Sequence, residues 1–258
     1  MEELIIKLWL CFWLGVLGAA LGSFLDCAAS RRAAGEPHPF RGRSHCGACG
    51  HTLGAADLIP VLSFLLRRGK CRYCGQRIPL DCLFSELAGA AILAAVGARF
   101  GLGLELGQWL VFAVLLLALS LEDAFRRILP DGLLLALAAN RILWFFLLGQ
   151  GVPEALAILP ACAIPAAVLG LTLLWEKRSG REVMGGGDIK LLFALALYLD
   201  WAQLLLALMA GCLLGLAWAA LTRRRKGATL PFGPFLAGGA LAAVCFAGPL
   251  LDWYFSLF

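Results

Sequence analysis

Residues 105–127 read ELGQWLVFAVLLLALSLEDAFRR, an apolar run followed directly by acidic and basic residues. A helix needs about 20 apolar residues to cross the hydrocarbon core of a bilayer. Of the 258 residues, 61% are hydrophobic and 15% are charged, whereas a soluble domain carries about 25% charge. We therefore predict an all-α integral membrane protein. It has about eight transmembrane helices, near residues 4–25, 83–98, 105–122, 132–149, 153–175, 188–200, 202–222 and 233–256.

The basic residues lie in clusters between these apolar runs. Cytosolic loops carry an excess of Lys and Arg, and an outside N-terminus puts all Lys and Arg except Lys7, Arg99 and Arg141 in the cytosol. A nucleic-acid site would gather such residues on one folded face, so the lipid bilayer, and not nucleic acid, is the expected partner. The clusters are Arg31 to Arg43, Arg67 to Arg77, Arg126–Arg127, Lys177 to Arg181 and Arg223 to Lys226.

Four cysteines lie in the insert that follows the first predicted helix. Cys46 and Cys49 form one C-x-x-C pair, and Cys71 and Cys74 form a second. Two such pairs at this separation are typical of a tetrahedral zinc site. The alternatives are two disulfides or a redox pair, which are rare in the cytosol, where this insert is expected. Four protein ligands leave no open position, so we expect a structural zinc in a zinc-ribbon-like cytosolic insert.

These features divide the chain into three predicted parts. Residues 1–30 form the first transmembrane helix, residues 31–82 the four-cysteine insert with its flanking helices, and residues 83–258 a transmembrane helical bundle.

Two aspartates are expected at the same membrane edge. Asp123 ends the third predicted helix, and Asp188 opens the sixth after Gly185, Gly186 and Gly187. Two carboxylates that share a site hold one proton between them, which provides a general base and a general acid together. The three glycines would let an extended substrate strand approach Asp188. A plainer alternative is that Asp188 caps its helix.

Several motifs of the chain are similar to those of a known family. The chain resembles the bacterial type IV prepilin peptidases along nearly its whole length. Asp123 stands seven residues before Pro130, as the first catalytic aspartate of that family does, and Asp188 closes a G-x-G-D motif. The other similar segments are Gly22–Leu25, the four cysteines, Asp57–Phe64, Arg68–Cys74, Glu86, Met184–Leu191 and Pro231–Ala237.

The resemblance implies an enzyme of the bacterial inner membrane, a membrane aspartyl protease with Asp123 and Asp188 as its catalytic pair. Members cut the leader from type IV prepilins or type II secretion pseudopilins on the cytosolic side. Many then methylate the new N-terminus with S-adenosylmethionine, and Glu86 and Arg31 are the residues here that this second activity would involve.

The chain departs from the family pattern near the region linked to methylation. Residues 26–33 read DCAASRRA, which keeps only an arginine of the usual run, and Asp81-Cys82-Leu83 stands where Arg-Tyr-Pro is common. We therefore predict leader cleavage with weak or no methylation. Glu122 is a further departure, since an apolar residue usually precedes the first aspartate.

Two other classes of protein fit the sequence less well. A transporter or channel would place polar residues in mid-membrane along a path, whereas the acidic pair here lies at the membrane edge. A stand-alone methyltransferase would show a glycine-rich fingerprint after a strand, and the sequence has none.

Overall fold

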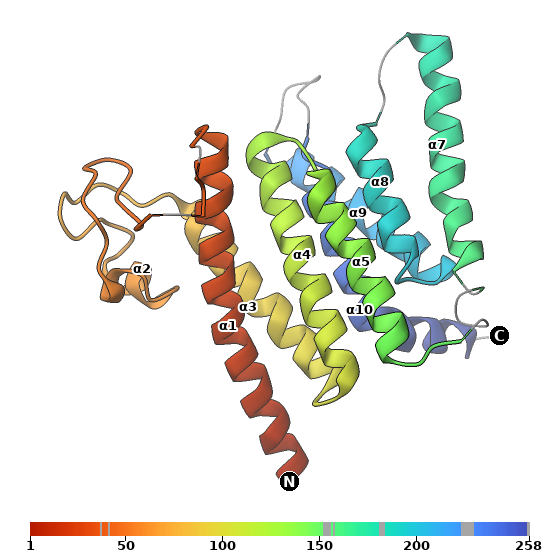
Figure 1. Ribbon diagram of the computed structural model, residues 1–258, viewed down its shortest axis with the longest axis horizontal. Helices are drawn as coiled ribbons and strands as arrows, with labels where there is room; N and C mark the ends of the chain where they lie inside the picture. The colour runs from red at the N-terminus through yellow and green to blue at the C-terminus, as the bar shows by residue number, and fades with distance from the viewer. Residues whose placement is uncertain are drawn as a thin grey trace. The chain divides into compact units, whose positions relative to one another are not determined.

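The computed structural model describes residues 1–36, 38–40, 42–151, 156, 158–180, 184–222 and 230–256, with side chains of 249–255 left aside. This part of the chain is helical apart from the insert (Figure 1), as predicted. The basic residues Arg223 to Lys226, Arg41 and Arg181, and the first residues of the predicted helix 153–175, lie outside the described residues.

Each of the eight predicted segments contains a helix among the described residues. By length and composition, five of these helices can cross a membrane: α1, α3, α4, α7 and α9. The shorter α8 has 11 residues, about 16 Å, where the sequence predicted residues 188–200. The eight helices are α1 (Glu2–Ala33), α3 (Leu80–Phe100), α4 (Leu104–Arg126), α5 (Asp131–Leu147), α7 (Leu159–Ser179), α8 (Gly186–Ala196), α9 (Trp201–Leu221) and α10 (Gly233–Phe255).

The chain forms two compact units, Met1–Leu121 and Glu122–Phe258. In the first unit, α1 packs along α3, and glycines allow the two helices to touch. A Cβ at Gly18 would collide with the Gly89 carbonyl, and a Cβ at Gly22 with the Ser85 carbonyl. The close packing places the C-terminal end of α1 beside the start of α3, and the insert connects these two ends (Figure 1).

The insert has almost no hydrophobic core. It contains one turn of 3-10 helix, η1 (Ala55–Asp57), and the five-residue helix α2 (Leu62–Leu66). Between residues 42 and 78, only Gly69 and Cys71 are buried. Because so little apolar surface is removed from water, the fold of the insert needs another source of stability.

In the second unit, the short helix α8 forms the centre. Its side chains Leu191, Leu192 and Leu195 are fully buried, and it contacts α5, α7, α9 and α10. The neighbouring helices α9 and α10 pack closely, because a Cβ at Gly239 would collide with the Ala207 carbonyl. A helix surrounded in this way holds the residues at its N-terminus in fixed positions.

Candidate active site and candidate metal centre

The four cysteines of the insert come together in a single cluster. Their sulfur atoms all lie within 4.8 Å of one another, and Cys46 Sγ is 3.9 Å from Cys74 Sγ. Four sulfurs at zinc–sulfur distance on the corners of a tetrahedron are about 3.8 Å apart. The cluster therefore has the size and chemistry to hold a metal such as zinc, as the cysteine spacing predicted.

Each C-x-x-C pair lies on its own turn, and the two turns are alike. The Cys46 N–H donates to the His51 carbonyl at 2.9 Å, and the Cys71 N–H donates to the Gln76 carbonyl at 2.8 Å. Gly50 and Gly75 follow the second cysteine of each pair with φ of 69° and 71°, a conformation that favours glycine. This repetition explains why both turns present two sulfurs in the same way.

The electrostatics of the cluster favour a bound cation. The backbone N–H groups of Cys49 and Ala48 lower the pKa of the Cys46 thiol to about 6. At Cys74 the Gln76 N–H acts in the same direction, but burial and the three neighbouring cysteines raise the pKa to about 11. Because like charges this close repel one another, four thiolates need a cation among them.

In the second unit, the two aspartates predicted to be catalytic approach each other. Asp123 lies in the last turn of α4 with 6% of its surface exposed, and Asp188 lies in the first turn of α8. The two carboxylates lie near enough to interact electrostatically. The Gly233 N–H, at the start of α10, donates to Asp123 Oδ2 at 2.8 Å. Gly233 lies in the segment Pro231–Ala237 that resembles the family, but the sequence alone does not predict its contact with Asp123.

The glycines before Asp188 occupy different surroundings. A Cβ at Gly187 would lie 3.1 Å from the Leu129 Cβ, in the loop after α4, whereas a Cβ at Gly186 would meet nothing within 4 Å. Gly185 adjoins Asp188 itself, at 3.4 Å from Oδ2. Gly187 thus lets α8 approach the loop that follows Asp123, and the described residues leave room at Gly186.

Helix α8 is tied to α5 near both of its ends. At the N-terminal end, Lys190 Nζ forms an exposed ion pair with Asp131 at 2.7 Å. Just past the C-terminal end, the Tyr198 hydroxyl donates to the Leu137 carbonyl at 2.7 Å and accepts from Asn140 at 2.9 Å, and Arg141 donates to the Leu197 carbonyl at 2.8 Å. These contacts fix the height of α8, and hence of Asp188, along α5.

Glu122, the departure next to Asp123, is buried with 4% of its surface exposed and pairs with Arg126 at 3.2 Å. Adjacent helix positions point about 100° apart. The Glu122 side chain therefore points toward Arg126, away from the direction in which the Asp123 side chain points.

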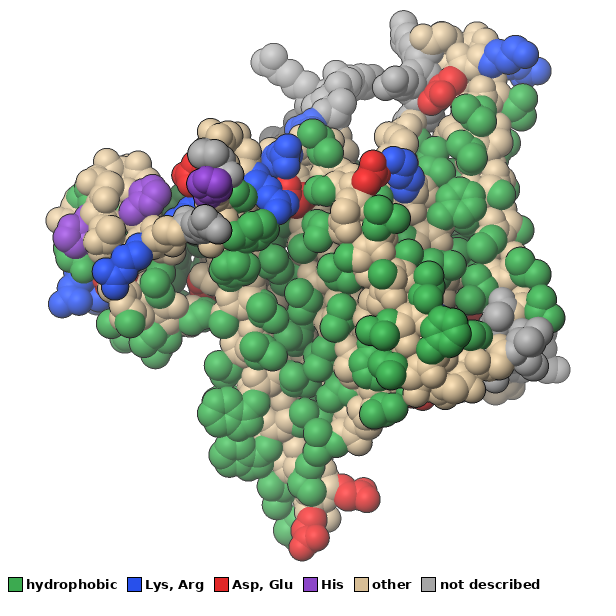
Figure 2. Space-filling model, viewed as in Figure 1, with side chains coloured by type: hydrophobic (Ala, Val, Ile, Leu, Met, Phe, Trp, Pro, Cys, Tyr) green, Lys and Arg blue, Asp and Glu red, His purple; other side chains and the backbone are tan. Residues whose placement is uncertain are grey.

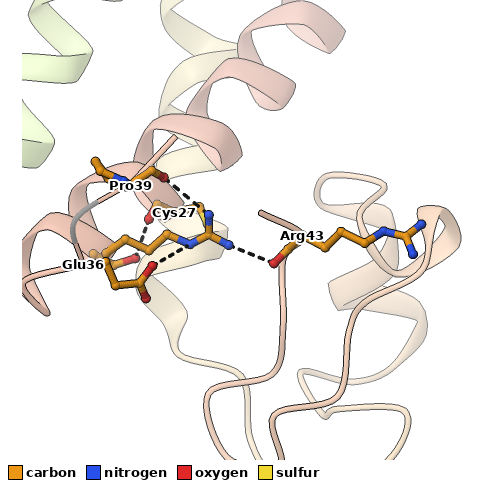
Figure 3. A network of polar contacts seen from close by, with 6 residues as sticks. Cys27, Glu36, Pro39 and Arg43 are labelled. Carbon is orange, nitrogen blue, oxygen red and sulfur yellow. Dashed lines mark hydrogen bonds and ion pairs between the residues drawn. The ribbon is translucent and has the colours of Figure 1, made fainter. Parts of the chain in front are cut away.

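In the first unit, Arg31 and Glu86 both hold the insert. The Arg31 guanidinium donates to the carbonyl of Arg43 at 2.9 Å and to that of Pro39 at 3.4 Å, and it lies 3.6 Å from Glu36 (Figure 3). The buried Glu86 carboxylate accepts from the Val61 N–H at 2.6 Å. Val61 has a φ of 61°, which is strained for a β-branched residue, so this contact fixes an unusual turn before α2.

A cavity of about 600 Å³ lies between the insert and the facing ends of α1 and α3. Its lining includes Arg31, Glu86, Cys27 and Cys82 as well as residues of both cysteine turns. This volume is in the range of sites for small molecules.

These observations define a helical membrane protein with two neighbouring carboxylates and a four-cysteine insert. Residues 16–100 match the Bacterial Peptidase A24 N-terminal domain, and residues 110–220 match the Type IV leader peptidase family. The chain therefore belongs to the type IV leader peptidase family and is a multi-pass membrane protein.

Relatives from several bacteria are similar over most of the chain. A prepilin leader peptidase/N-methyltransferase of Bacillus subtilis is 34% identical, over 94% of this chain and 96% of the relative. Proteins of the same description from Burkholderia pseudomallei and Pseudomonas putida are 36% and 32% identical, over 91% and 89% of this chain and 84% and 88% of theirs. No solved structure matches the chain.

Proposed function

We propose that this protein removes the leader peptide of type IV prepilins or type II secretion pseudopilins by a two-aspartate mechanism. The family membership supports the reaction and the substrate class. The observation that carries the mechanism is the placement of Asp123 in the last turn of α4 and of Asp188 in the first turn of α8, with Gly187 packed against Leu129 in the loop after α4. The cytosolic face of the bacterial inner membrane is the proposed place of cleavage, because the basic loops favour an outside N-terminus and eight spans.

The contact with Gly233 suggests how the two carboxylates divide the work. A backbone N–H that donates to a carboxylate favours its charged form, and Asp123 accepts such a bond. We assign Asp123 as the base that takes a proton from water and Asp188 as the acid that donates one to the scissile carbonyl oxygen. When the tetrahedral intermediate breaks down, Asp123 returns its proton to the leaving amine nitrogen and the carbonyl forms again, which restores the proton to Asp188.

The substrate strand is expected to lie beside Gly185 and Gly186. Among the described residues, a Cβ at Gly185 would meet only the Asp188 carboxylate within 4 Å, and a Cβ at Gly186 would meet nothing. Close approach to a backbone without Cβ atoms brings the scissile bond within reach of the carboxylates.

We assign the four cysteines a structural zinc. The sulfur spacing and the scarcity of buried side chains in the insert support this role. A site with four thiolate ligands has no open position for a water molecule, so the aspartates supply the chemistry of cleavage.

The cavity beside Arg31 and Glu86 is the proposed place of a second activity, N-methylation, which we expect to be weak or absent because the neighbouring sequence departs from the family pattern. The relatives are described as N-methyltransferases as well as leader peptidases, and the cavity is large enough for S-adenosylmethionine. When bound, this cofactor would supply an electrophilic methyl group. Arg31 and Glu86 would shape its site by holding the insert in place, through the contacts with Arg43 and Val61.

The direct test is to incubate the purified protein with a candidate prepilin and determine the mass of the product. Loss of the leader mass alone indicates cleavage, and a further increase of one methyl group indicates methylation. An intact substrate, in a panel that includes prepilins from the same genome, would contradict the proposed function.

A further inference from the structure

The insert exposes an apolar surface around α2, which we name the α2 face. Leu66 and Leu65 are 75% and 60% exposed, and the other members are between 43% and 49% exposed. The α2 face consists of Leu58, Ile59, Leu62, Leu65 and Leu66. Five neighbouring large aliphatic side chains that face outward from so small a unit mark an interaction surface.

Basic side chains border this apolar face. Arg67, Arg68 and Lys70 follow α2 directly, and Arg68 and Lys70 are exposed. Arg67 forms an ion pair with Asp57 at 2.9 Å, which ties the end of α2 to η1. A short apolar helix edged by Arg and Lys suits the boundary between acyl chains and anionic headgroups.

The position of the α2 face within the first unit indicates what covers it. Figure 1 shows α2 at the edge of the insert turned toward the N-terminal end of α1. Figure 2 shows hydrophobic side chains along this edge and along α1, with Lys and Arg side chains at the outer rim of the insert. α1 is a candidate membrane span, so the lipid bilayer around α1 is the occupant that the position of the α2 face favours.

The start of the insert is held in the same way. Phe24 of α1 is 51% exposed and stacks on Phe40 of the insert, with ring centroids 6.1 Å apart, and the Arg32 guanidinium lies 4.7 Å from the Phe40 centroid. Interfacial segments combine Phe, Trp or Leu side chains with Lys and Arg. The insert therefore has interfacial side chains both at Phe40 and at α2.

We propose that the α2 face lies on the bilayer beside α1, with its leucines among the upper acyl chains and with Arg68 and Lys70 at anionic headgroups. This contact would complete the fold of the insert, which has little core of its own. It would also hold the cavity beside Arg31 and Glu86 at a fixed distance from the membrane surface.

The test places a photo-crosslinker on the α2 face of the full-length protein. p-Benzoylphenylalanine replaces Leu66 in one sample and Tyr73, in the second cysteine turn and 45% exposed, in a matched control. Both proteins are reconstituted in nanodiscs that contain phosphatidylglycerol, irradiated, and analysed by mass spectrometry. We expect a phospholipid adduct at position 66 in severalfold higher yield than at position 73.

A second pair of variants tests the role of the charges. Arg68→Gln should lower the phospholipid adduct at position 66 severalfold, because each basic residue at an anionic surface adds to binding. Arg72→Gln, which removes the same charge from the second cysteine turn, should leave the yield unchanged.

The other possible occupants give different products. An adduct to added prepilin, or to a second copy of the chain, in place of lipid would overturn the proposal and name the true partner. Equal lipid yields at positions 66 and 73 would also overturn it. Leader cleavage measured on the same samples keeps this result separate from a failure of the proposed function.

Discussion

The four cysteines come from two short turns in one insert, whereas the aspartate site needs the ends of α4, α8 and α10. Each cysteine turn closes with its own hydrogen bonds and a glycine of positive φ. At the aspartate site, Gly187 before Asp188 packs on Leu129, and the Gly233 N–H donates to Asp123. A locally built site is disrupted mainly by changes to its own ligands, and a site built by several helices is sensitive to changes in the packing around it.

The largest effect should follow from a change in the aspartate pair itself. We expect Asp123→Asn to lower leader cleavage by roughly 10³-fold, because an amide cannot take a proton from water. The protein should remain folded in the membrane, with its metal content unchanged. Rates measured with a purified prepilin, together with the melting temperature, check this expectation.

Glu122→Gln is the matched control for Asp123→Asn. The two residues are neighbours on α4, but Glu122 pairs with Arg126. Glu122→Gln should lower the rate of leader cleavage severalfold at most. If the Glu122 variant were the inactive one of the two, the first carboxylate would have to be reassigned to Glu122.

A packing change next to the aspartates should have the next largest effect. A Cβ at Gly233 would lie 2.8 Å from Asp123 Oδ2, so Gly233→Ala displaces the carboxylate. Such a misplacement costs roughly 10²-fold in rate. Gly238→Ala on the same helix is the control, because its Cβ would meet only Leu214 Cδ1 at 3.7 Å; equal cleavage by the two variants would argue against a role for Gly233.

A change in the metal centre should affect zinc content more than leader cleavage. Cys71→Ser should lower the zinc content below one per chain and loosen the insert, and its loss of cleavage should be smaller than that of Asp123→Asn. Metal analysis and limited proteolysis of the insert provide the measurements. Cys212→Ser, at an exposed cysteine of α9, should leave one zinc bound, and protein purified without chelators that contains no zinc would refute the assignment.

The smallest effect expected is on the second activity. We predict that mature pilin carries little or no added methyl group, because Ala29, Ser30 and Ala33 replace larger residues near Arg31 and Asp81-Cys82-Leu83 replaces Arg-Tyr-Pro before Glu86. Methyl transfer depends on exact alignment of amine and cofactor. Mass spectrometry of the mature N-terminus measures it, and a fully methylated product at limiting enzyme would show that the altered site still works.

The difference between the two sites also explains what the sequence could predict. The positions of the helices followed from apolar runs, and the cysteine cluster followed from spacing, because both are local patterns. The end of α8 at Ala196 did not, since Asn140 and Arg141 of α5 bind Tyr198 and Leu197 just beyond it. The sequence predicted only that Arg141 is one of three basic residues outside the cytosol, and not that it binds the end of α8.

The contact between Gly233 and Asp123 could not be predicted either, because it too depends on contacts between different helices. The glycine lies far from Asp123 in the chain, and its hydrogen bond depends on how the start of α10 packs. The roles of Glu86 and Arg31 as anchors of the insert were also not predicted, because a buried carboxylate that accepts from a strained Val61 leaves no periodic pattern.

In the proposed mechanism the aspartates cut the prepilin, and the cysteines only hold a metal. The most direct test is the mass of a prepilin after incubation with Asp188→Asn protein whose zinc content has been measured. We expect one zinc per chain and an intact prepilin, while wild-type protein in parallel removes the leader. A prepilin shortened by the zinc-loaded Asp188→Asn protein at a near-normal rate would contradict it.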